Sequence, residues 1–108
     1  MATTYKVLGQ AHPAATTNTD LYTVPSATSA VCSTLAICNL GAAATYRIAV
    51  RVAGATIEDK QYIVHDATIN ADDSALLTLG ITLAATDVVT VYASTADVSF
   101  NLFGSELT

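Results

Sequence analysis

The residues best suited to chemistry are His65 and Asp66, which are adjacent in the sequence, and the isolated His12. An imidazole beside a carboxylate suggests acid–base catalysis, which also needs a nucleophile or a second acid positioned by the fold. Ser and Thr are plentiful, yet the G-x-S-x-G turn that presents a catalytic serine does not occur. We therefore predict that the protein is not an enzyme and has no catalytic residues. His65 is expected at a strand end, exposed or hydrogen-bonded to a neighbour.

Carboxylates form the second candidate group, because Asp72 and Asp73 are adjacent and Asp20, Asp66 and Asp87 lie elsewhere in the chain. Calcium prefers carboxylate and carbonyl oxygens, but this spacing matches no EF-hand loop. Adjacent Asp residues in a turn commonly hydrogen-bond the backbone. We interpret them as turn residues and predict neither a metal site nor a cofactor.

Cys32 and Cys38 fall in one strand-like run, AVCSTLAIC. In a regular strand they would face the same side about 20 Å apart, whereas a disulfide needs Cα atoms within about 7 Å. The spacing also matches no zinc pattern. We interpret both as small buried apolar residues.

Arg47 and Arg51 share one face of an alternating segment, with Ala49 between them. Two guanidinium groups among small residues would suit acidic groups on a partner. The alternative is a solvated sheet face on which they pair with Glu58 or Asp59 of the same chain. The sequence leaves both interpretations open.

Residues 1–20 are expected to form an N-terminal arm followed by a polar loop. Flexible polar segments of this kind can become ordered on a partner. Lys6, His12 and Asp20 belong to this segment, and with Arg47 and Arg51 they make up the candidate partner-contact residues.

The composition limits the classes of partner. The 108 residues carry a net charge of −5 with only four basic side chains, which argues against nucleic-acid binding. Only 12% of residues are charged, and Ala and Thr are unusually common. Such a surface loses little side-chain entropy when a partner covers it; the alternative is an ordinary small β domain. No secretory signal and no run of membrane-spanning length is visible.

The hydrophobic pattern predicts a single all-β domain over residues 1–108. Turn signals recur about every ten residues, as in an antiparallel β-sandwich or jelly roll. We predict eight strands and expect the first and last to pair, because free terminal edges invite aggregation. Gly80 interrupts one strand and suggests a bulge or the close approach of another backbone segment. The predicted strands are residues 4–10, 21–24, 30–38, 45–52, 61–65, 75–83, 88–93 and 98–103.

Three segments together cover nearly the whole chain and carry a family resemblance. They are KVLGQAHPAATTNTDLYTVPSATSAVCSTLAICN, TYRIAVRVAG and TLAATDVVTVYASTADVSFNLFGSEL. This pattern resembles small virion proteins of tailed bacteriophages, including phages of cyanobacteria.

The resemblance implies a β-rich structural protein, made in the host cytoplasm and located in the virion. It implies a homo-oligomer, a trimer or dimer, whose partners are the major capsid protein or other virion proteins, with no nucleic-acid or membrane partner. Two roles stay open. One is a capsid decoration, or cement, protein that bridges capsid subunits, and the other is a tail, baseplate or fibre module that contacts the host surface.

Overall fold

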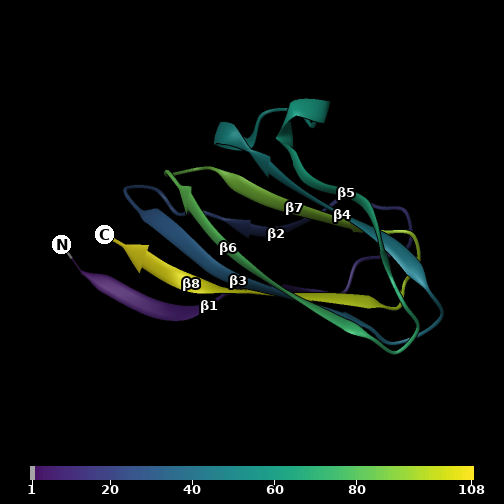
Figure 1. Cartoon of the computed structure of the whole chain (residues 1–108). Helices are drawn as coiled ribbons and strands as arrows, with labels where there is room; N and C mark the ends of the chain where they lie inside the picture. The colour runs from purple at the N-terminus through teal and green to yellow at the C-terminus, as the bar shows by residue number, and fades with distance from the viewer. Residues whose placement is uncertain (1) are drawn as a thin grey trace.

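The computed structural model describes residues 2–108. Its eight strands form two four-stranded antiparallel sheets that face each other (Figure 1). Sheet A has the strand order β1-β8-β3-β6, and sheet B has the order β2-β7-β4-β5. Two short 3₁₀ helices, η1 (Val52–Gly54) and η2 (Asp59–Gln61), connect β4 to β5. The strands are β1 (Thr3–Ala11), β2 (Thr19–Thr23), β3 (Ser29–Asn39), β4 (Ala44–Arg51), β5 (Tyr62–Ile69), β6 (Ser74–Leu83), β7 (Val88–Ala93) and β8 (Val98–Leu107).

The strand pairing is that of a jelly roll. β1 pairs with β8, β2 with β7, β3 with β6 and β4 with β5, as if one long hairpin were rolled into two sheets. The predicted all-β sandwich of about eight strands is therefore confirmed, as is the pairing of the first and last strands. The two ends of the chain lie side by side (Figure 1), where Ala2 and Thr108 exchange two backbone hydrogen bonds.

The core lies between the sheets and follows from the alternation of side chains along each strand. Inward-facing residues of β8 (Val98, Phe100 and Leu102) are fully buried, whereas the intervening Ser99 and Asn101 are only half-buried. β4 alternates as predicted, with Tyr46 and Ile48 directed inward. Val52, the last residue of the predicted strand 45–52, instead lies exposed in η1 because β4 ends at Arg51.

A row of β-bulges crosses sheet A. Leu8 is an extra residue of β1 against β8, and Ser33 is an extra residue of β3 against the same strand. β6 carries one more residue than β3 between Thr78 and Ile81, and this segment contains Gly80 with a φ of +66°. The bulge expected at Gly80 is thus confirmed, because glycine adopts this left-handed conformation without a steric penalty.

The bulge at Ser33 overturns part of the prediction for the two cysteines. One extra residue exchanges inner and outer positions, so Cys32 faces the core while Cys38 lies on the outer face of sheet A, opposite Ser74 and Ser99. Cys32 is buried as expected, and burial raises the pKa of its thiol to about 11. Cys38 is only half-buried, and both thiols are free.

The expected N-terminal arm also requires a correction. Met1 lies outside the described residues, but Thr3–Ala11 is the edge strand β1 and is hydrogen-bonded to β8 along its length. Only the segment between β1 and β2 is a loop. At the other boundaries β5 continues to Ile69, past its predicted end at residue 65, and β8 continues beyond Phe103 to Leu107.

Asn39, at the end of β3, holds the turns at one end of the sandwich together. Its side chain is buried, with 1% of its surface exposed. The amide nitrogen donates to the carbonyl oxygens of Ala42, Ile69 and Asn70, and the amide oxygen accepts from the backbone N–H of Gly41. The β3–β4 turn and the end of β5 therefore share one buried polar group, and a buried amide without such partners would destabilise the fold.

Gly9 is expected to be far less tolerant of substitution than Gly80. A Cβ at position 9 would overlap the backbone carbonyl of Leu21, where β1 of sheet A meets β2 of sheet B, whereas nothing lies near a Cβ at position 80. Gly9→Ala should lower the free energy of unfolding by about 3 kcal/mol or more. Gly80→Ala should cost about 1–2 kcal/mol through backbone strain alone. Urea denaturation of both variants tests this, and equal losses would contradict it.

Candidate interaction surfaces

The outer face of sheet B carries an ion pair whose arginine lies over an aromatic ring. Arg47 of β4 donates from Nε and Nη2 to the two carboxylate oxygens of Asp66 on β5, at 2.6 and 3.2 Å. Its guanidinium carbon lies 4.3 Å from the centre of the Tyr92 ring, a cation–π geometry. The hydrogen bond from Arg47 holds the pKa of Asp66 below its ordinary value, and the same bond raises the pKa of Arg47.

His65 and Tyr62 lie beside the Arg47–Asp66 ion pair. Their rings meet edge to face with centroids 4.9 Å apart, and His65 Nδ1 lies 3.6 Å from Asp66 Oδ2. With Asp59 these two residues line an open pocket of about 390 Å³. His65 is exposed as expected, but it lies within β5 rather than at a strand end.

Arg51 fastens the connection between β4 and β5 to sheet B. Nη1 donates to Asp20 Oδ1 at 2.9 Å and to the Thr90 hydroxyl at 3.3 Å. Nε and Nη2 donate to the carbonyl oxygens of Ala55 and Gly54 at 2.8 and 3.0 Å. These acceptors occupy the planar fork of the guanidinium, so Arg51 has a structural role in orienting η1.

Lys6 belongs to a third cluster, at the end of the sandwich where the chain termini meet. Glu106 of β8 accepts a hydrogen bond from the Tyr22 hydroxyl at 2.5 Å and from Lys6 Nζ at 3.0 Å. Since Tyr22 lies on β2 of sheet B, this cluster joins the two sheets. The bonds from Tyr22 and then from Lys6 lower the pKa of Glu106, while burial and Glu106 together raise that of Tyr22.

The structure therefore distributes the predicted partner-contact residues over three places. Asp20, Arg47 and Arg51 share the outer face of sheet B, Lys6 lies in the Glu106 cluster, and His12 is exposed in the β1–β2 loop. For the arginines, intramolecular pairing is correct in kind, but the acceptors are Asp66 and Asp20 rather than Glu58 or Asp59.

Glu106 was not a candidate because the last strand was expected to end at Phe103. Had the alternation of β8 been continued through Gly104 to Leu107, Glu106 would have fallen on the inner face with Phe100 and Leu102. A carboxylate on the inner face near the end of a strand was thus the sequence feature that could have identified Glu106. Its partner Tyr22 is 84 positions away in the chain, and no local pattern indicates that pairing.

The outer face of sheet A differs from that of sheet B, because it presents no charged side chain among residues 2–108. Lys6 is the closest exception in sequence, yet it alternates with Tyr5 and Val7 and its ammonium is bonded to Glu106 on the inner side. We call this surface the neutral face. Its members include Tyr5 and Val7 of β1, Val31 and Ser33 of β3, Leu76 and Thr78 of β6, and Phe103 and Ser105 of β8.

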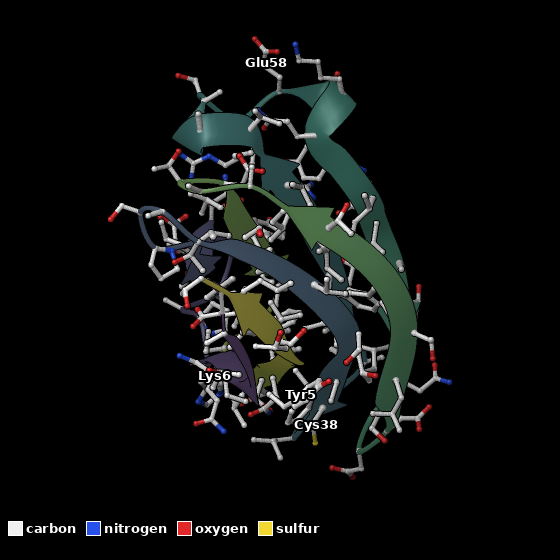
Figure 2. All side chains as sticks on the ribbon, turned by 90° about the vertical axis from the view of Figure 1, so that its left-hand side faces the viewer. Tyr5, Lys6, Cys38 and Glu58 are labelled. Atoms are coloured by element: carbon white, nitrogen blue, oxygen red, sulfur yellow. The ribbon has the colours of Figure 1, made fainter. Side chains whose placement is uncertain are left out.

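Several large apolar side chains are exposed on the neutral face. Tyr5 is 84% exposed, Leu76 71% and Phe103 37%. A shallow groove of about 640 Å³ runs over β1, β8 and β3, and its walls include Val7, Val31 and Phe103 together with Lys6, which is paired with Glu106. Figure 2 places Tyr5 and Cys38 at the bottom of the molecule and Glu58, in the η1–η2 connection, at the top. The apolar surface and this charged connection therefore lie on opposite sides.

No group of three or more His, Cys, Asp or Glu side chains within residues 2–108 is placed to hold a metal ion. Over the same residues, no helix has the length and apolar character needed to cross a membrane. The arrangements that the structure does contain are ion pairs within the chain and one extended apolar surface.

The Glu106 cluster should make stability depend on pH. Because the folded pKa of Glu106 lies below the ordinary value of about 4.3, the unfolded chain takes up this proton first as pH falls. The stability from this group is thus complete above about pH 5 and is lost as pH falls through the folded pKa. Glu106→Gln should cost about 1–2 kcal/mol at neutral pH, and the difference from the natural chain should narrow toward pH 3.

Urea denaturation at a series of pH values measures this effect. Glu58→Gln is the matched control, because Glu58 lies on the opposite side of the molecule in an exposed pair with Lys60. A difference between the natural chain and Glu106→Gln that stays constant with pH would contradict the ionic role of Glu106.

A scan of the chain against protein-family models gave no match, and a search of the curated proteins gave none either. The resemblance to phage virion proteins therefore stays a prediction. Any function has to be argued from the surfaces described above.

Proposed function

We propose that the protein is a structural component of a bacteriophage virion, a capsid decoration protein that bridges and stabilises neighbouring capsid subunits. The observation that carries this proposal is the neutral face, an uncharged sheet surface with exposed apolar side chains. Extended apolar surfaces of this kind mark sites of protein contact. Burial of such area contributes about 25 cal/mol per Å², and this cohesion would help a shell to resist the pressure of packed DNA.

The charge distribution supports a protein partner. Of the four basic side chains, Lys6, Arg47 and Arg51 are bonded within the domain to Glu106, Asp66 and Asp20, and Lys60 lies 3.5 Å from Glu58. A nucleic acid would need an unengaged basic surface. The partners proposed are therefore the major capsid protein, other virion proteins and further copies of this chain.

The jelly-roll topology is compatible with this role. Viral capsid domains use this architecture, but lectins and cupins use it too. Because one fold serves many functions, the neutral face and not the topology supports the proposed role. Small neutral side chains also lose little conformational entropy on contact, which favours assembly.

A tail or fibre module that binds the host surface is the second candidate. The observation in its favour is the open pocket lined by Asp59, Tyr62 and His65. An aromatic ring beside hydrogen-bonding groups is a common way to bind a small polar ligand such as a sugar. This pocket lies on the sheet B side, away from the neutral face.

Cryo-electron microscopy of virions that contain this chain tests the proposal. We expect copies of the sandwich on the head lattice, between capsid subunits and repeated by the symmetry of the shell. Particles assembled without the chain should regain the same density after incubation with the purified protein. Before the protein is added back, the particles that lack the chain should resist heat and loss of DNA less well than complete virions do.

Other locations would contradict the decoration role. Density only at the tail, baseplate or fibres would favour the host-binding module, and Tyr62→Ala should then reduce attachment to cells. Absence of the chain from purified virions would overturn both roles. Deletion of residues 1–20 is not a clean test, because it removes β1 from sheet A.

A further inference from the structure

We propose that the neutral face is the site at which two copies of this chain stack on each other around a two-fold axis, forming a four-layered sandwich. This inference narrows the proposed virion role, because it assigns the neutral face to contact between two copies of the chain, so that the stacked pair rather than the single chain would bridge capsid subunits. It follows from the charge, the shape and the size of the surface, in that order.

Charge complementarity favours a second copy. The chain carries a net charge of −5, so two copies repel each other when their charged surfaces meet. Acidic residues lie in the turns and on the outer face of sheet B, as with Asp66, Asp72 and Asp97. The neutral face brings no unpaired charges together when it meets itself, because Lys6, which lines its groove, is bonded to Glu106 of the same chain. It offers little attraction to a strongly charged partner.

The shape of the face is complementary to itself. A two-fold interface places the same patch on both sides, so each protrusion needs a recess within that patch. Tyr5 projects from β1 with 84% of its surface exposed, and it stands beside the groove bounded by Val7, Val31 and Phe103. In a two-fold stack, Tyr5 of each copy can enter the groove of the other, so one pairing occurs twice.

The size of the face is sufficient for a specific dimer. Four strands spaced about 4.8 Å apart, with about nine residues each at about 3.3 Å, span roughly 19 by 30 Å. Two such faces together cover about 1,100 Å² in projection, and side-chain relief makes the accessible area larger. Specific interfaces bury about 1,200–2,000 Å² in total, so the neutral face falls near the lower end of this range.

The edges of sheet A do not obstruct such a stack. β1 is held by its pairing with β8 and by the contact of Gly9 with β2. The bulges keep the side chains of the neutral face directed outward on all four strands. Sheets pack face to face about 10 Å apart at a small angle set by their twist. Two copies of sheet A can therefore meet in the same way that sheets A and B meet within one copy.

Sedimentation equilibrium of the purified full chain over a range of concentrations tests the proposal. We expect a monomer–dimer equilibrium whose dissociation constant changes little with NaCl, because the charge at the groove, that of Lys6, is paired with Glu106 within the same copy. Tyr5→Glu and, separately, Leu76→Glu should each weaken dimerisation by at least about tenfold, because each buries two unpaired carboxylates per dimer. Both side chains are exposed in the monomer, so either variant should keep the natural unfolding midpoint when it is measured at a concentration at which the natural chain is monomeric.

Val52→Glu is the matched control. Val52 is 69% exposed in η1, and the substitution adds the same charge away from the neutral face. It should leave the dimer intact. A natural chain that stays monomeric at the highest concentration would overturn the proposal, as would an oligomer that Val52→Glu weakens and the two face variants do not. A monomer that binds capsid particles, and loses this binding in Tyr5→Glu, would assign the face to the capsid lattice and equally overturn the two-fold stack.

Discussion

The row of β-bulges across sheet A is the constraint on which the rest of the structure depends. β8 runs without interruption, while β1 and β3 each add one residue against it and β6 adds one against β3. The extra residue exchanges the inner and outer positions that follow it on β1 and on β3, whereas β6 keeps its alternation across the bulge. On β3, Cys32 can therefore face the core on one side of the bulge, while Leu35 and Ile37 face it on the other. Without the bulge at Ser33, one of these two halves would present its apolar residues to solvent.

The few charged side chains of the protein are used to join segments that are far apart in the sequence. Arg51 ties η1 to sheet B, and Glu106 joins β1, β2 and β8 near the chain termini. Partly buried ion pairs contribute less to stability than their number suggests, but they set the orientation of connections that lack an apolar core of their own. One consequence is that the two outer faces become chemically different, because the pairs that involve the arginines lie on sheet B and none lies on the neutral face.

This difference between the faces suggests how a small domain can serve in an assembly. A sandwich of this size buries a limited fraction of its apolar surface by itself, and an uncharged face lets it bury more against another surface. In the proposed assembly the charged face stays in contact with solvent. Contact area, hydrogen bonds within the chain and symmetry are sufficient for such a role, and no reactive group is required.

The sequence by itself determined the strands, because alternation with a period of two and the spacing of turns are local properties. Each of the eight predicted strands overlaps an observed one, although β5 and β8 extend beyond their predicted ends and residues 1–20 were also expected to form an arm and a loop. The burial of Cys32, the bulge at Gly80 and the shared face of Arg47 and Arg51 were predicted as well. Only the tertiary structure decided which side Cys38 faces, that residues 3–11 are a strand rather than an arm, and which acceptors the arginines bind. It also assembled the neutral face from four strands. The pairing of strands that are distant in the sequence sets these features. A local sequence pattern does not specify which distant strand lies beside a given one.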